Sequence, residues 1–516
     1  MEQGSIPSPH ILIFPAQGQG HVNATLKLAE LLSLAGFKIT FINFQYVHER
    51  LVRNTDVEAR FSKYHGFQFK TIPVCRPDDP QRTERWRKLS VKSKPIFKRM
   101  VIESKPTVNY IIGDGVLGFV HDVAVEIGIP AIQMHCLSAC SFWTFFSIPD
   151  VVAAHQLPIK GIPTIICHPF LNDLFIPFNC ITYGSNLLKL KGKEDMDRLI
   201  TKVPGMETFL RCRDLPAGFC QVSDISDPNL FFITNEIRKS QALIINTFEE
   251  LEGPILSQIR TRYSKIYTIG PLHEHLKTKL RSIGKQELYS SSNSLWKVDG
   301  TCITWLDNQP SQSVLYVSFG SSTIVTRDQL MEFWYGLVNS KKKFLWVIRP
   351  ESVINQDGDN LGEIPEELQE GGKERGYVVK WAPQEEVLAH KAIGGFLTHS
   401  GWNSTLESIA AGVPMICWPY FGDQQVNSRY VSEIWKLGLD MKDVCDRRVV
   451  EKMVNDLMVD RREEYVKSTA RMQELARKSV SEDGSSSCCL NRLIEDIRLM
   501  NKKAYASDND KDNLSR

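Results

Sequence analysis

The stretch "GGFLTHSGWNSTLESIAAG" (residues 394–412) combines two kinds of local structure. It begins with the apolar run 394–398, which predicts a buried strand. Small polar residues follow at 400–404 and lead into a helix. The stretch therefore predicts a strand, a turn and a helix in succession, which is the repeating unit of a parallel α/β sheet.

The same alternation extends outward from this stretch and occurs again in the first half of the chain. The strand-like run 10–16 is followed by a helical pattern at 22–36. The strand-like run 313–320 is followed by a helical pattern at 326–340, which begins with a capping box. Further strand-like runs lie at 37–44, 109–114, 130–135, 344–350, 377–381 and 414–419. This pattern predicts an α/β fold with two parallel sheets, each covered by helices on both faces.

Two domains are also expected, because 516 residues are more than a single hydrophobic core normally accommodates. The polar, Ser-rich segment 280–300 indicates the connection between them. We expect an N-terminal domain (1–270), a linker (271–309), a C-terminal domain (310–484), a C-terminal helix that returns to the N-terminal domain (485–502) and a disordered polar tail (503–516).

The composition is that of a soluble globular protein, with 42% hydrophobic and 24% charged residues. A net charge of +2 gives no reason to expect a nucleic-acid partner or an anionic membrane. The 12 cysteines are scattered without zinc-site spacing, which favours reduced thiols and a cytoplasmic location. The most apolar long stretch, 131–154, contains Gln133, His135 and Asp150, so we expect a buried helix or pocket wall and no membrane insertion.

Polar and glycine residues gather just after the predicted strands. They lie at 18–21, at Asp114, at 320–322 and at 399–404. Ligands of open α/β sheets bind outside the carboxyl ends of the strands. Two such domains that face one another would therefore place these residues around one cleft.

The turn at 399–404 has the chemistry of a phosphate site. Free backbone amides and the helix dipole at a helix start favour an anion. His399, Asn403 and Ser404 can add hydrogen-bond donors, His399 most strongly if it is protonated. A plain helix cap is the alternative interpretation.

Four more residues extend this pattern toward a nucleotide sugar. Trp381 follows a strand and can stack on a flat base, or else pack in a core. Glu407 lies one helical turn beyond Asn403 and can accept the hydroxyls of a ribose, or else be a surface carboxylate. Asp423 and Gln424 can hold sugar hydroxyls, or else form a turn. Together they describe a pocket for a base, a ribose, a diphosphate and a sugar.

Residues 381–424 carry the order Trp-Ala-Pro-Gln, His-x-Gly-Trp-Asn-Ser, Glu and Asp-Gln. This order resembles the 44-residue signature of the plant family-1 UDP-sugar-dependent glycosyltransferases, the secondary-product glycosyltransferase box. The resemblance implies the GT-B fold, in which two Rossmann-like domains face one another across a cleft. It implies a UDP-sugar donor with these ligands: Trp381, Ala382 and Gln384 for uracil; Glu407 for ribose; Ser321, His399, Asn403 and Ser404 for the diphosphate; Trp402, Asp423 and Gln424 for the hexose.

The same resemblance implies a catalytic pair in the first half. His21, in "PAQGQGHVN", would be the base that takes a proton from the acceptor hydroxyl. Asp114 would orient the imidazole and stabilise its charged form, with Asp122 as the competing candidate. The expected chemistry is inverting transfer of glucose, for which Gln424 is typical, to give a β-glucoside. The cleft motifs contain no D-x-D-type carboxylate pair, so we expect no metal ion and no cofactor beyond the UDP-glucose co-substrate, and we expect a monomer.

The acceptor is expected to be a small lipophilic plant metabolite that binds to the N-terminal half and receives glucose on a hydroxyl or a carboxyl group. Candidate pocket residues are Gly20, Met134, Phe142, Trp143 and Phe421. Arg76 stands in a loop that departs from the common family pattern and can border this pocket. The sequence as a whole most resembles those of plant enzymes that glucosylate terpenoids, iridoids among them. A flavonoid or phenolic acceptor is the alternative.

Two other functions compete with this interpretation. "GQGHVN" approaches the dinucleotide-binding motif G-x-G-x-x-G of dehydrogenases, but Asn23 replaces the third glycine, and the next strand does not end in an acidic residue. A non-catalytic nucleotide-sugar-binding protein on the same fold would not need His21 or Asp114, and both are present.

Overall fold

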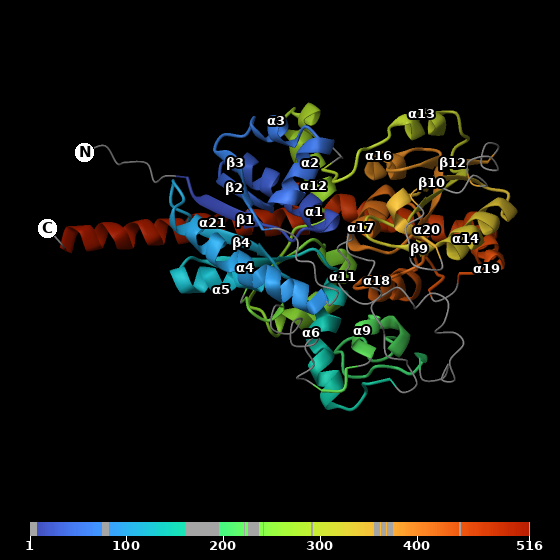
Figure 1. The fold of residues 1–516 in the computed structure, drawn as a ribbon, viewed down its shortest axis with the longest axis horizontal. Coiled ribbons are helices and arrows are strands. Elements are labelled where there is room, and N and C mark those ends of the chain that lie inside the picture. The colour runs from blue at the N-terminus through green and yellow to red at the C-terminus, as the bar shows by residue number, and fades with distance from the viewer. Residues whose placement is uncertain are drawn as a thin grey trace.

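The computed structural model describes residues 8–74, 82–159, 196–220, 222–224, 237–240, 242–289, 293–355, 362, 368, 375–442 and 445–514. Two parallel sheets form its centre, and helices lie on both faces of each (Figure 1). The N-terminal sheet occupies the half drawn in blue and green, and the C-terminal sheet the half drawn in yellow and orange. The α/β class with two facing units is the one that the strand and helix alternation predicts.

The first sheet has seven strands in the order β3-β2-β1-β4-β5-β6-β7. Every residue of β1 and β4 is buried, which explains why these strands are continuous apolar runs without alternation. The strands are β1 His10–Phe14, β2 Lys38–Phe44, β3 Phe67–Ile72, β4 Tyr110–Asp114, β5 Ala131–His135, β6 Ala242–Ile245 and β7 Lys265–Thr268.

Helices connect these strands and cover the sheet. They are α1 Gln19–Leu34, α2 Gln45–Asn54, α3 Val57–Phe61, α4 Arg82–Ile102, α5 Gly118–Ile127, α6 Ala139–Ala153, α9 Ala217–Cys220, α11 Glu249–Arg260 and α12 Leu272–Ser282, with short 3-10 turns η2 Cys212–Asp214 and η3 Gln286–Leu288. The apolar stretch 131–154 becomes β5 and the buried helix α6, and no helix among the described residues is long and apolar enough to cross a membrane.

The second sheet has six strands in the order β12-β10-β8-β13-β14-β15. The strands are β8 Val314–Ser318, β10 Lys343–Val347, β12 Gly376–Val379, β13 Ile393–Thr398, β14 Met415–Cys417 and β15 Gly438–Asp440, with a separate pair β9 Val325–Thr326 and β11 Val353–Ile354. The helical elements are α13 Thr301–Asp307, α14 Arg327–Asn339, η4 Pro350–Ser352, α16 Gln384–Ala389, α17 Trp402–Ala411, α18 Gln424–Arg429, η5 Tyr430–Ile434, α19 Arg447–Asn455, η6 Asp456–Asp460 and α20 Arg462–Ser479. The expected capping box is present at the start of α14, where Thr326 and Gln329 bond each other's backbone.

Both sheets reverse their strand order at one place. In the first sheet the reversal lies between β1 and β4, and in the second between β8 and β13. Crevices for ligands form at the carboxyl ends of the strands on either side of such a reversal. Asp114 is the last residue of β4, Ser321 and His399 follow β8 and β13, and His21 lies in the first turn of α1, which follows β1.

The long helix α21, Ser485–Leu514, packs on the first sheet although it follows the second. Leu490, Leu493 and Ile497 are buried in the same apolar cluster as β1 and β4. Figure 1 shows this helix, in red, passing behind the N-terminal half and projecting beyond it toward the C-terminus. The helix covers most of the segment 503–516 that we expected to be disordered, because no Pro or Gly interrupts residues 485–514 and extending a formed helix costs little.

The connection between the two units is shorter than the expected linker 271–309. Its first part is helix α12, and Leu272, Leu276 and Leu280 are buried in the N-terminal core. This spacing of four residues places the three leucines on one face of a helix, which is why the segment packs against the N-terminal unit.

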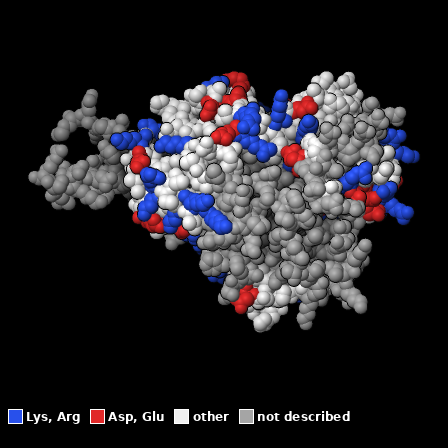
Figure 2. All heavy atoms as spheres, viewed as in Figure 1, with Lys and Arg blue, Asp and Glu red and all other residues white. Residues whose placement is uncertain are grey.

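The surface carries charges of both signs. Figure 2 shows Lys and Arg side chains interspersed with Asp and Glu over both halves of the molecule. This distribution agrees with the net charge of +2.

The docking of α21 can be tested with the substitution Leu493→Ala. Leu493 has no exposed surface, so its truncation should lower the free energy of unfolding by about 2–5 kcal/mol. Leu499→Ala on the same helix is the control, since 52% of Leu499 is exposed, and it should change stability by less than about 0.5 kcal/mol. Chemical denaturation measures both, and equal effects would show that α21 is not held by this contact.

Candidate active site

A cavity of about 290 Å³ lies between the two sheets, at the carboxyl ends of their strands. Residues of both halves line it. The described lining includes His21, Gly115, His135, Phe145 and Asn293 from the first half and the linker, and Ser321, Trp381, Gln384, His399, Trp402, Asn403, Ser404, Glu407, Asp423 and Gln424 from the second. The expected donor residues therefore lie around one space, opposite His21.

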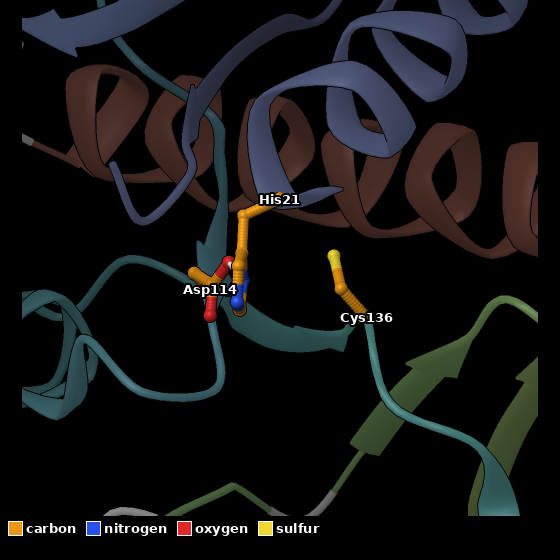
Figure 3. Close-up of side chains that lie close together, drawn as sticks. All are labelled: His21, Asp114 and Cys136. Carbon is orange, nitrogen blue, oxygen red and sulfur yellow. Dashed lines mark hydrogen bonds and ion pairs between the residues drawn. The ribbon is translucent and has the colours of Figure 1, made fainter. Parts of the chain in front are cut away.

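His21 and Asp114 form a hydrogen-bonded pair at one side of this cavity (Figure 3). The distance from Nδ1 of His21 to Oδ2 of Asp114 is 2.7 Å. The backbone amides of Ala16 and Val116 also donate to the Asp114 carboxylate, so its position is set from three sides. The pairing holds the imidazole in the form that carries its proton on Nδ1 and leaves Nε2 available to a ligand.

The pair also changes the acidity of both groups. Burial alone would lower the pKa of His21, but the charge of Asp114 and the hydrogen bond to it hold the pKa of His21 well above its usual value. Burial alone would raise the pKa of Asp114, and the facing His21 instead lowers it. Asp122, the competing candidate, lies on α5 and pairs with Lys239 at 3.0 Å, away from His21.

The thiol of Cys136 lies beside this pair. The ligand atoms of His21, Asp114 and Cys136 are all within 4.8 Å of one another, and Figure 3 shows Cys136 standing beside the other two side chains. These are donor types that a divalent metal ion accepts. The Asp114 oxygens, however, already accept hydrogen bonds from two backbone amides and His21, and a metal ion would have to displace the imidazole from its partner. The arrangement fits a hydrogen-bonded pair better than a metal site.

The start of α17 faces His21 from the other half of the molecule. Gly401 is the N-cap of α17, and no side chain caps this helix, so the plain-cap alternative does not account for the polar turn. The backbone amides of the first turn are therefore available for an anion. Asn403 and Ser404, in the same turn, both line the cavity.

His399 differs from expectation in its charge. It is partly exposed to the cavity, but its surroundings desolvate the ring, and this desolvation together with the charge of Arg349 lowers its pKa to about 4. It is therefore neutral near pH 7 and offers a single N–H donor. The His399 ring packs directly against the backbone of Gly320 and Gly401. Both positions require glycine, because a Cβ on either residue would lie 2.4 Å from Nε2 of His399.

The part of the cavity that is expected to hold the base and the ribose is built around Trp381 and Gln384. The indole of Trp381 stacks on Trp296 with ring centroids 4.8 Å apart, which leaves its other face for a ligand. The amide nitrogen of Gln384 donates to Glu407 at 2.7 Å and to Ser404 at 2.8 Å. Burial, and then the negative charge of Glu385, raise the pKa of Glu407 to about 7. Glu407 is thus a buried carboxyl and not a surface residue.

A buried ion cluster under this side of the cavity joins the two halves. Lys27 of α1 contacts Glu385 of α16 at 3.0 Å, and Lys277 of α12 contacts the same carboxylate at 3.4 Å. Burial would raise the pKa of Glu385, but these cations and His273 lower it to about 2. Sequence reasoning missed this cluster, since a Lys or a Glu within an amphipathic helix normally faces solvent.

Trp402, Asp423 and Gln424, the residues that are expected to hold the hexose, also line the cavity. The Trp402 indole nitrogen donates to the backbone of Asn246 in the other half, at 2.7 Å. Burial raises the pKa of Asp423 to about 6. The side-chain carbonyl of Gln424 accepts hydrogen bonds from the backbone amides of Tyr420 and Phe421, so Gln424 does help to form the turn. Its amide nitrogen is the atom that remains for a ligand.

The acceptor side requires a correction. Gly20 and Phe421 line the cavity, but Met134, Phe142 and Trp143 lie in the apolar cores. Successive side chains of a strand point to opposite faces, so Met134 packs under α1 while His135 reaches the cavity. The cavity wall is formed instead by Val116, Leu137, Phe145 and Ile237. Arg76 lies outside the described residues.

Known proteins resemble this chain along its whole length. A sequence profile described as "UDP-glucoronosyl and UDP-glucosyl transferase" matches residues 299–476. The 7-deoxyloganetic acid glucosyltransferase of Catharanthus roseus is 51% identical over 508 residues, which cover 96% of this chain and 98% of that protein. The myricetin 3-O-rhamnoside 1,2-glucosyltransferase of Crocosmia x crocosmiiflora is 40% identical over 96% of this chain and 97% of its own.

Solved structures show the same fold. Os79 of O. sativa, in complex with UDP, has a TM-score of 0.73 at 23% identity and covers 94% of this chain and 100% of its own. A UDP-glucose: anthocyanidin 3-O-glucosyltransferase, also with UDP, has a TM-score of 0.73 at 22% identity, with coverage of 96% and 99%. The two facing sheets, the shared cavity and the full-length identity to glucosyltransferases together lead to one conclusion: the chain belongs to the plant UDP-sugar-dependent glycosyltransferases and has their GT-B fold.

Proposed function

We propose that the protein transfers glucose from UDP-glucose to a hydroxyl group of a small terpenoid aglycone of the iridoid type, with inversion, to form a β-glucoside. The observation that carries the proposal is the single cavity in which the His21–Asp114 pair faces the uncapped start of α17. Displacement at the anomeric carbon of a sugar requires a base on one side of that carbon and a site for the anionic leaving group on the other side.

In the proposed step, Nε2 of His21 takes the proton of the acceptor hydroxyl while that oxygen bonds to the anomeric carbon. The bond from this carbon to the diphosphate oxygen breaks, and UDP leaves with the electron pair. Asp114 stabilises the imidazolium through its 2.7 Å hydrogen bond. The amides of the first turn of α17, with Asn403 and Ser404, stabilise the charge that develops on UDP. Attack from the side opposite to UDP inverts the configuration.

The donor side favours a neutral hexose. Trp381 and Gln384 suit the uracil, and Glu407, with a pKa of about 7, can both donate to and accept from the ribose hydroxyls. Asp423 and the Gln424 amide nitrogen face the sugar end. No Lys or Arg is among the described residues of the cavity lining, so a uronic acid carboxylate would lack a cation. These features support UDP-glucose over UDP-glucuronate.

The proposed class of acceptor is supported by the acceptors for which relatives of this chain are named. Two proteins of Catharanthus roseus that are 51% identical to this chain are named for 7-deoxyloganetic acid, an iridoid acceptor. The relative named for a myricetin rhamnoside, at 40% identity, keeps a flavonoid acceptor as the second candidate. We further propose a cytoplasmic location, because the described cysteines are free thiols, as in a reducing compartment.

The substitution His21→Ala should reduce glucose transfer by about 10²–10⁴-fold, because it removes the general base. Binding of UDP should stay close to that of the wild type, since the residues proposed to hold UDP belong to the second half and do not include His21. Initial rates with UDP-glucose and an iridoid acceptor, together with calorimetric titration of UDP, measure the two effects. Retention of more than half of the activity would exclude His21 as the base.

The raised pKa of His21 predicts the pH dependence. The base must be neutral, so kcat/KM should fall as the pH drops through the pKa of His21, and this acidic limb should lie above about pH 6.5. Asp114→Asn removes the charge that raises this pKa, so the limb should move to lower pH and the maximal rate should fall. Asp122→Asn, in the surface pair with Lys239, is the control and should leave the profile unchanged. An unchanged profile in Asp114→Asn would exclude the pairing.

The selection of glucose can be tested by competition among UDP-glucose, UDP-galactose, UDP-xylose and UDP-glucuronate at equal concentrations. The glucoside should dominate, since an unpaired buried polar group costs about 1–3 kcal/mol for a mismatched sugar. Gln424→Ala should raise the KM for UDP-glucose or lower kcat, while UDP alone binds as before. If the variant behaves like the wild type, Gln424 only shapes the turn at Tyr420 and Phe421.

A further inference from the structure

Two buried polar side chains on the acceptor side of the cavity are not used by the proposed reaction. His135, the last residue of β5, is 2% exposed, and its Nε2 has no hydrogen-bond partner among the described residues. Gln17, which follows β1, is 4% exposed, and both atoms of its amide lack such a partner. Both residues line the cavity. Buried polar groups are rarely left unpaired, so each needs an explanation.

Both side chains lie next to the catalytic pair. Ala16, which precedes Gln17, donates its backbone amide to Asp114 at 3.1 Å. The His135 ring lies against Gly115, which follows Asp114, since a Cβ on Gly115 would come within 2.1 Å of Cε1 of His135. A ligand whose hydroxyl reaches His21 therefore passes close to both groups.

The position of His135 is held by its surroundings. Its ring meets Phe142 edge to face, with centroids 4.8 Å apart, so α6 supports it from behind with an apolar group. The ionisable groups that act on it are Asp114 at the end of β4 and His21 on α1, and Cys136 follows it in the chain. Burial is the main cause that lowers the pKa of His135, to about 4, and His135 is therefore neutral in the empty cavity.

The rest of this side of the cavity is apolar, being lined by Val116, Leu137, Phe145 and Ile237. Such a wall suits a largely hydrocarbon molecule with one polar group placed against His135 and Gln17. No Lys or Arg is among the described lining residues, so His135 is the group near this wall that can gain a positive charge without serving as the base.

We propose that His135 and Gln17 form a subsite for a carboxylate of the acceptor, beside the hydroxyl that is glucosylated. This inference rests on the proposed function and deepens it, since it defines the acceptor as a hydroxy acid. The Gln17 amide nitrogen donates to one carboxylate oxygen, and Nε2 of His135 donates to the other. His135 takes up a proton from solvent on binding, because a carboxylate against it favours the charged imidazolium.

The carboxylate itself is not the nucleophile that attacks the anomeric carbon. It is ionised at neutral pH and has no proton for His21 to remove, whereas a hydroxyl needs that base. The product is therefore an O-glucoside with a free carboxyl group, and it resists mild alkali that would cleave a glucose ester.

The test compares 7-deoxyloganetic acid with its methyl ester as acceptors, in the wild type and in His135→Phe and Gln17→Leu. Each variant keeps side-chain size and loses its polar atoms. For the acid, kcat/KM should fall by about 10- to 100-fold, mainly through KM, and for the ester by less than about threefold. His121→Phe, an imidazole outside the cavity lining, should change neither acceptor, and Phe145→Ala in the apolar wall should weaken both alike.

Calorimetry of the acid with the UDP complex, in buffers of different ionisation enthalpy, gives a readout that does not need turnover. The wild type should take up close to one proton, and His135→Phe should take up none. Binding without proton uptake, equal losses for acid and ester, or an alkali-labile product would each overturn the subsite. Failure of the proposed function looks different: no glucose would reach any acceptor, while the acid would still bind with proton uptake.

Discussion

The contact between the first turns of α1 and α17 determines the geometry of the whole site. Nδ2 of Asn403 donates to the backbone oxygen of Gly20 at 2.8 Å, and the Trp402 indole donates to Asn246 at 2.7 Å. A Cβ on Gly20 would lie 3.3 Å from the same Asn403 amide, so the approach is close. Asn403 lies in the first turn of α17 and Gly20 directly precedes His21, so this contact fixes how far His21 lies from the start of α17.

Burial of ionisable groups has opposite consequences on the two sides of the cavity. His21 and Asp114 face each other with opposite charges, so the buried pair favours its ionised forms. Glu407 and Glu385 are like charges, and Lys27 and Lys277 contact Glu385 directly, whereas for Glu407 their attraction is outweighed by burial and by the charge of Glu385. Glu407 is left with a pKa near neutrality, which suits a group that exchanges hydrogen bonds with the hydroxyls of a ribose.

The sequence was sufficient for residues that act through backbone position or a local pattern. His21, Asp114 and the polar turn after β13 follow strands, and parallel strands bring their carboxyl ends to one edge, so their convergence could be predicted. The acceptor wall could not be predicted in the same way. Met134 and His135 are neighbours in the chain, yet strand alternation turns one into the core and the other into the cavity, and one residue of error in register exchanges them.

The amino-acid sequence by itself determined the class of fold, the two-domain organisation and the donor box, because periodicity and strand–turn–helix order are local properties of the chain. Only the tertiary structure decided which polar groups lack partners and which charges meet. Lys27 and Glu385 stand 358 positions apart in the sequence, and Gln17 and His135 belong to different strand ends. Hydrogen bonding and pKa values depend on neighbours in space and on exclusion of water, which exist only once the two sheets face each other.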